Sequence, residues 1–241
     1  MRNVVRFMLI VFLLVPNAAA AYLFMLSSKQ NLKAEIVQDG PAAFVSERPF
    51  VAEGVLRSPS GQSLISKHFQ HPCLAYQTKF DLLHTVVDSD GEEEDRRSEL
   101  FEERRQVPDL TVDFSSRKAL LDVQVLESFY RSQREELDEL PDYVDPSQIP
   151  TVNAERRWYE VHEAVLEDGQ NVTVVGRVNP QGVLEPHIGA GELIVFPGNT
   201  AECAAALQDA GTTYKIIGFV MIGMSVLGCL ILGIILKFMK S

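Results

Sequence analysis

Two long apolar segments bracket this chain, and every acidic residue lies between them. The second segment, residues 216–236, contains no charged residue. At about 1.5 Å rise per residue, it matches a hydrocarbon core roughly 30 Å thick. Lys215 precedes it and Lys237 and Lys240 follow it, where lysine side chains reach the lipid headgroups. This pattern predicts a C-terminal transmembrane helix over residues 215–238.

The first apolar segment, residues 7–26, has two interpretations. As a transmembrane helix over residues 1–26 it has the required length, with Pro16 producing a kink. As a secretory signal it has an apolar stretch followed by the small residues Ala18 and Ala20 near a cleavage site. The apolar run continues past that site to Leu26, which favours a retained helix.

The flanking lysines give a small bias in orientation. Lys237 and Lys240 outweigh Lys215, so both termini are expected in the cytoplasm. The domain between the spans would then face the periplasm of a bacterial inner membrane. In that oxidising space Cys73 and Cys203 are candidates for a disulfide, although two unpaired buried thiols are favoured because no motif spacing links them.

The middle of the chain alternates apolar and polar residues in short runs, which predicts a β-rich α+β domain over residues 50–214, between two transmembrane helices. A connector over residues 27–49, with a turn at Gly40-Pro41, precedes it. Two runs about a polar turn, residues 110–114 and 119–123, predict a hairpin. The other predicted strands are residues 50–56, 72–80 with an extension over 82–87, 156–165, 172–178 and 193–196, and the predicted helices are 124–140 and 202–209.

The charge of the domain limits its partners. The chain carries 33 acidic and 22 basic residues, a net charge of -11, and the domain is more negative than the whole. Nucleic acid is therefore excluded as a partner, because phosphates are repelled. Residues 88–109 mix both signs and predict a solvated acidic insertion, either a hairpin tip or an exposed helix. Their functional alternative is a docking surface for a basic partner.

No pattern of residues predicts catalysis, a cofactor or a metal ion. His162-Glu163 lacks the second histidine of a zinc helix, and His68 and His71 have no further ligand in register. Of Trp158 and Tyr159, one is expected to face the core of a β domain, although the pair also suits an interface. We therefore expect no catalytic, cofactor-binding or metal-ligating residues.

Small residues align along the second apolar segment. Gly218, Ser225, Cys229 and Gly233 follow at steps of seven, four and four, so they share one helix face. Such a face allows a second helix to approach closely. The partner would be the first span, a second copy or another membrane protein. The alternative is that glycine is simply common in membrane helices.

The order of several short motifs resembles the GIDE family, in which a domain beside the membrane lies between two transmembrane helices. The family pattern pairs a Pro-Cys-x-x-Tyr strand with an aromatic-Glu strand, an acidic-Gly turn and a Val-rich strand that ends in glycine. The positions that carry the resemblance here are Gly54, Pro72, Cys73, Tyr76, Tyr159, Glu160, Gly169 and Gly176.

The resemblance implies a relation to E3 ubiquitin ligases of mitochondrial and plastid membranes, which carry a RING finger after the second span. This chain continues only five residues past that span and holds three cysteines, too few for the paired zinc ligands of a RING. We therefore predict a membrane-anchored, non-catalytic scaffold that binds the bilayer and either a protein partner or itself. The alternatives are an E3-like protein that uses a RING from another subunit and a small subunit of a membrane transport complex.

Overall fold

The computed structural model describes residues 2–38, 50–87, 93–126, 132–150, 156–186 and 192–238. The chain forms two compact units. Helices α1 (Arg2–Gln38) and α2 (Thr200–Phe238) make one unit, and residues 41–199 make the other, which is a β domain. The predicted β-rich α+β class is confirmed, with one helix at the N-terminal end and one apolar helix at the C-terminal end.

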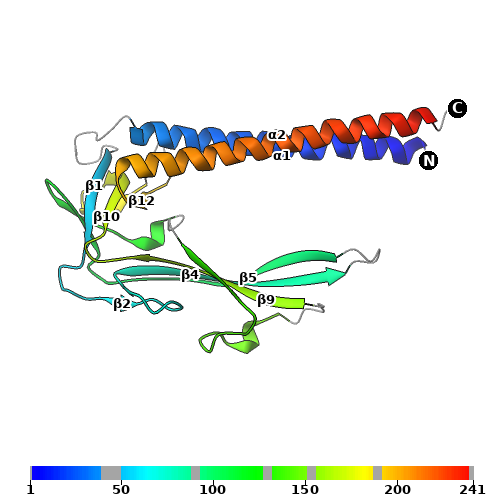
Figure 1. Cartoon of the computed structure of the whole chain (residues 1–241). Coiled ribbons are helices and arrows are strands. Elements are labelled where there is room, and N and C mark those ends of the chain that lie inside the picture. The colour runs from blue at the N-terminus through cyan, green and yellow to red at the C-terminus, as the bar shows by residue number, and fades with distance from the viewer. Residues whose placement is uncertain are drawn as a thin grey trace. The chain divides into compact units, whose positions relative to one another are not determined.

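The two helices pack antiparallel, and both chain termini lie at the same end of the pair (Figure 1). Three pairs of facing positions show the register. Asn17 bonds to Ser225, Phe24 lies against Gly218, and Asn31 lies against Gly211. Successive pairs are seven residues apart on both helices, which is the repeat of a coiled-coil seam.

Of the two predicted transmembrane helices, one is matched among the described residues by a helix long and apolar enough to cross a membrane, over Thr200–Ile231. Its apolar side chains are exposed in the isolated chain: Phe219 is 58% exposed, Met224 63% and Leu230 60%. The predicted helix at residues 202–209 is confirmed as the beginning of α2. The predicted connector is helical as far as Gln38, and Gly40-Pro41 lies outside the described residues.

The first sheet of the β domain has the strand order β11-β10-β1-β6-β7, and β12 also pairs with β10. All of these neighbours are antiparallel. The predicted hairpin is confirmed, because β6 and β7 pair about the turn at Ser115-Ser116-Arg117. The strands are β1 (Phe50–Arg57), β6 (Thr111–Phe114), β7 (Lys118–Leu120), β10 (Asn171–Val178), β11 (Leu184–Glu185) and β12 (Ile194–Pro197).

The second sheet has the order β5-β4-β9-β8, all antiparallel, and contains the longest strands of the domain (Figure 1). A bulge interrupts the β4–β5 register at Phe80/Asp81. The strands are β4 (Ala75–Val87), β5 (Glu93–Gln106), β8 (Gln133–Leu137) and β9 (Arg156–Leu166). A small two-stranded sheet, β2 (Leu64–Ile65) with β3 (Pro72–Cys73), and two 3₁₀ turns, η1 (Val123–Val125) and η2 (Pro146–Gln148), complete the domain.

For the predicted acidic insertion, the exposed-helix alternative is wrong: residues 93–106 form strand β5, which pairs antiparallel with β4 and has mostly exposed side chains. The predicted helix at 124–140 is also wrong: where the structure describes these residues they form η1 and β8, since β8 completes its backbone hydrogen bonds on the edge of β9. Residues 88–92 and 127–131 lie outside the described residues.

The described residues of the β domain include two apolar clusters. The larger joins the six-stranded sheet to the ends of β4 and β9, with Phe50, Leu56, Leu74 and Val174 at its centre. The smaller lies under one face of the four-stranded sheet, where Phe80 stacks between Phe101 and Tyr159, each at 5.5 Å. The opposite face of that sheet carries charged side chains, and it holds the candidate site.

Candidate functional site

The charged face of the four-stranded sheet carries a cluster of ionic side chains. Asp81 on β4 and Glu160 on β9 are paired across the strands, and they are only 4% and 2% exposed. The guanidinium of Arg97 on β5 bonds to the Asp81 carboxylate and lies 3.1 Å from Glu160 Oε1. Such buried carboxylates persist only when charge and hydrogen bonds compensate them.

Two further groups complete the cluster around Glu160. Arg134 on β8 lies 2.8 Å from its Oε2, and the His162 ring contacts its Oε1. Burial by itself would raise the pKa of Glu160. The hydrogen bond from His162 and the charges of Arg97, His162 and Arg134 outweigh it, so the pKa of Glu160 is lowered. The carboxylate is therefore ionised at neutral pH.

Asp81, Glu160 and His162 offer ligand atoms that all lie within 4.8 Å of one another, as a metal site requires. Arg97 occupies this position, however. Its Nη2 atom contacts Asp81 and Glu160 and lies 3.0 Å from His162 Nε2. The cluster thus already contains its own cation. In the sequence His162 stands beside Glu163 and far from Asp81, and only the pairing of β4 with β9 brings Asp81 near it.

Glu163 lies on the other face of β9 and is 2% exposed. Its carboxylate accepts hydrogen bonds from the backbone N–H groups of His68 and Phe69, at 2.8 and 3.0 Å, and from the Thr78 hydroxyl at 2.7 Å. Burial would raise its pKa, but these bonds and one from Ser66 lower it. Glu163 therefore serves as an anchor that ties the β2–β3 loop to the sheet.

The histidines of that loop do not form a metal site with one another. His68 Nδ1 lies 2.7 Å from the Tyr143 hydroxyl, and Nε2 lies 2.9 Å from Glu135. Both ring nitrogens of His68 are thus engaged in holding the loop. His71 stacks near Phe69 instead, at 6.2 Å between ring centres.

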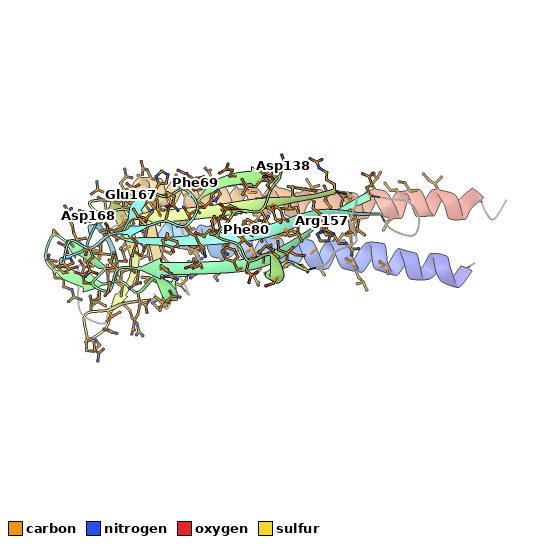
Figure 2. The ribbon with its side chains drawn as sticks, turned by 90° about the horizontal axis from the view of Figure 1, so that it is seen from below. Phe69, Phe80, Asp138, Arg157, Glu167 and Asp168 are labelled. Carbon is orange, nitrogen blue, oxygen red and sulfur yellow. The ribbon has the colours of Figure 1, made fainter. Side chains whose placement is uncertain are left out.

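A pocket of about 310 Å³ lies at one end of the β domain. Figure 2 shows two of its lining residues, Glu167 and Asp168, at the opposite end of the domain from Arg157. The Cys73 thiol also lines it. Burial, with the nearby charges of Glu163 and Glu167, raises the pKa of that thiol to about 11, so it is protonated and a poor nucleophile. The lining residues are Ser58, Gly61, Gln62, Ser63, Pro72, Cys73, Leu74, Glu167 and Asp168.

The positions that carry the family resemblance are spread over all three sheets and the β9–β10 turn. Pro72 and Cys73 form β3, and Gly169 makes the β9–β10 turn with a φ of 78° that favours glycine. Tyr76 donates to Glu103 at 3.4 Å. Tyr159 faces the smaller apolar cluster and Trp158 lies half-buried on the other face.

The two remaining glycines of this set allow close packing. A side chain at Gly54 would meet Val112 and Phe114, and one at Gly176 would meet Leu193 and the Glu185 carbonyl. Both therefore have structural roles, and only Glu160 of the set belongs to the ionic cluster.

The predicted small-residue face of α2 is turned toward α1 at the positions the structure describes. Ser225 is 2% exposed, and a methyl group on Gly218 would lie 3.2 Å from the Phe24 ring. Cys229 is half-buried, and Gly233 lies further along the same helix. Of the three partners considered for this face, the N-terminal helix is the one seen here. The thiols of Cys73 and Cys203 are free and buried.

Comparison with known proteins adds no relative: no family model, no curated protein and no solved structure matches this chain.

Proposed function

We propose that this chain is a membrane-anchored, non-catalytic interaction protein, held in the bilayer by a hairpin of two helices. The observation that carries the proposal is the ring of exposed apolar side chains on α2. Ile217, Phe219, Val220 and Ile231 are each 44–58% exposed, and no charged residue interrupts this stretch. A surface of this kind is unfavourable in water and favourable in lipid.

The packing register supports a second span. Extended from the Asn17–Ser225 and Phe24–Gly218 pairs, it sets Ile231 opposite Val11 and Ile216 opposite Leu26. If α2 crosses the bilayer, this part of α1 crosses with it. Leu14, Val15, Tyr22 and Met25 are 58–63% exposed, so α1 also offers lipid an apolar surface.

The lengths of the helices indicate a stalk as well as an anchor. Helices of 37 and 39 residues extend roughly 55–60 Å at about 1.5 Å per residue, about twice a hydrocarbon core. Apart from Arg2, Arg6 and Lys237 near the termini, the charged residues of α1 and α2 lie in the halves that connect along the chain to the β domain, from Lys29 to Glu35 and from Glu202 to Lys215. We infer that these halves project from the membrane, with the domain outside and both termini in the cytoplasm of a bacterial cell.

The described polar clusters favour binding over catalysis. The Asp81 and Glu160 carboxylates are neutralised by Arg97 and Arg134, and Glu163 is saturated with donors. A general base or a nucleophile needs an uncommitted lone pair near a substrate cleft. These three carboxylates instead hold strands and a loop in place.

Membership of the GIDE family remains part of the proposal. It is supported by the strand order, in which the Pro72–Tyr76 segment leads into β4, β4 pairs with the Tyr159-Glu160 strand, and Gly169 turns that strand into β10. A ubiquitin-ligase role would require a RING from another subunit, and a purified chain that forms zinc-dependent ubiquitin conjugates would overturn the non-catalytic assignment.

The anchoring is tested by alkaline carbonate extraction of membranes, from which a hairpin anchor is not released. Sidedness is tested with a cysteine introduced at Asn3 or at the exposed Asp168, in a Cys229→Ala background in which the remaining thiols, Cys73 and Cys203, are buried, and with a maleimide that cannot cross the membrane. We expect intact spheroplasts to label the cysteine at 168 and not the one at 3. Release by carbonate would refute the anchor, and the reverse labelling would refute the orientation.

The interaction role needs its own experiment. Mild solubilisation from the native membrane, followed by mass determination, should give the chain in a stoichiometric complex. A purely monomeric chain at all concentrations would contradict the proposal.

A further inference from the structure

Strand β5 is the outermost strand of the four-stranded sheet, and within the described residues no strand pairs with its outer edge. The strand is 14 residues long and most of its side chains are exposed. A long open edge is a template for another strand unless charge or distortion prevents pairing. The charged side chains of β5 therefore determine which strand can pair with its outer edge.

The charges of β5 form two blocks with the same order of signs. Glu94-Asp95-Arg96-Arg97 and Glu102-Glu103-Arg104-Arg105 each place two acids before two arginines. When such a pattern meets a second copy running antiparallel, acids fall opposite arginines. In the register centred between Glu99 and Leu100, the opposed pairs are Glu94–Arg105, Asp95–Arg104, Arg96–Glu103 and Arg97–Glu102.

The bulge in β5 makes this register geometrically consistent. Directly opposed residues on antiparallel strands must point to the same face of the sheet. Glu99 pairs with Asp81, but Phe101 pairs with Phe80, so Leu100 is the extra residue. This shifts the alternation by one, and Arg97 therefore shares a face with Glu102 and Arg96 shares a face with Glu103.

Neighbouring registers are unfavourable. A shift by two residues in one direction sets Arg96 opposite Arg105 and Arg97 opposite Arg104. A shift in the other direction sets Glu94 opposite Glu103 and Asp95 opposite Glu102. Like charges directly opposed destabilise a pair of strands, so the sequence selects a single register.

We propose that two copies of this chain join edge to edge through β5, about a two-fold axis between Glu99 and Leu100, to form one continuous sheet. Such an interface is isologous, since each acidic block meets the basic half of its copy. The segment at η1 covers β5 at residues 104–106: the Gln124 side chain reaches the Arg104 carbonyl at 3.4 Å, the Arg104 guanidinium contacts the Leu126 carbonyl, and the Val123 N–H donates to Gln106 Oε1 at 2.6 Å. Backbone pairing is therefore centred on residues 96–103, and the Glu94–Arg105 ion pairs flank it.

Within the chain the acids already lie against arginines two positions along β5, as in Glu94–Arg96, Glu102–Arg104 and Glu103–Arg105. A second copy is the occupant that the charges favour, because in the proposed register it sets pairs of the inverse order beside these, so that the charges alternate in sign across the interface. The dimer does not depend on the proposed membrane role, since β5 belongs to the β domain. A dimer held by the helices alone would leave the β5 edges apart, and the experiment separates the two cases.

The test is disulfide cross-linking of the full chain in its membranes, in a Cys229→Ala background. Across the proposed axis, the two Glu99 Cα atoms lie about 6 Å apart, within disulfide range, while the two Glu93 Cα atoms lie roughly 40 Å apart. Both side chains are exposed. We expect Glu99→Cys to give a covalent dimer on mild oxidation, and we expect Glu93→Cys to give none.

Charge reversal then tests the register. Glu94→Arg places an arginine opposite Arg105 and should abolish the Glu99→Cys dimer, while adding Arg105→Glu should restore it. Both positions are exposed, and circular dichroism checks the fold of each variant. Equal cross-linking of Glu93→Cys and Glu99→Cys, a product of another mass, or no rescue in the double variant would each overturn the proposal.

Discussion

The Asn17 side chain of α1 donates a hydrogen bond to the Ser225 hydroxyl of α2, at 3.1 Å. The two residues lie 208 positions apart in the chain and within the segments that we assign to the bilayer. In a hydrocarbon core an unpaired amide is costly, so this bond selects one register of the helix pair among those that apolar contacts allow.

Removing that bond should weaken the helix pair modestly. We expect Asn17→Ala and Ser225→Ala each to lower the free energy of unfolding, with a coupling energy of about 0.6 kcal/mol and at most about 1.7 kcal/mol in a double-mutant cycle. Unfolding by SDS titration in mixed micelles measures it. Strictly additive effects would show that the bond does not form in the membrane.

A larger side chain at the α1–α2 contact should disturb the packing of the two helices more than a larger side chain on the lipid-facing side of α2. Gly218→Leu drives a side chain into the Phe24 ring, whereas a methyl group at Gly223 meets no described atom within 4 Å. We expect Gly218→Leu to slow disulfide formation between cysteines placed at 17 and 225, and Gly223→Leu to leave it unchanged. Equal effects of the two variants would contradict the seam.

Glu163 makes the β domain sensitive to acid. Because its pKa in the folded chain lies below the ordinary value of 4.5, its contribution to stability is complete above pH 4.5 and declines as the pH falls below it. Glu163→Gln should cost about 2 kcal/mol at neutral pH, since an amide cannot accept all four bonds. The variant should also lose less stability than the wild-type chain as the pH falls below 4.5. Thermal unfolding from pH 7 to 3, with exposed Glu167→Gln as control, measures both.

Arg97 should keep metal ions out of the ionic cluster. Arg97→Ala leaves Asp81 and Glu160 less compensated and should cost about 1–2 kcal/mol, less than for a fully buried pair because Arg97 is half exposed. The three ligand groups are then open, so zinc should raise the Tm of Arg97→Ala and not that of Arg97→Ala/His162→Ala. A zinc-dependent rise in the wild-type chain would contradict this role of Arg97.

The sequence by itself determined the elements whose signal is local. An uninterrupted apolar run is incompatible with solvent, so α2 could be read directly from residues 216–236. Short runs rich in aromatic and β-branched residues identified β1, β9 and β10, and the polar turn at Ser115-Ser116 identified the β6–β7 hairpin. In these segments the side chains alone select the backbone conformation.

Only the tertiary structure decided the segments whose backbone is stabilised by distant partners. Strand β5 is as polar as a solvated loop, and it is a strand because β4 supplies its hydrogen bonds and because Phe101 stacks on Phe80. The ionic cluster is equally non-local, since Asp81, Arg97 and Glu160 come from three strands. Only one side of the contact between the helices could be predicted. The spacing of Gly218 and Ser225 is visible in the sequence, but their partners Phe24 and Asn17 are set by packing between the two ends of the chain.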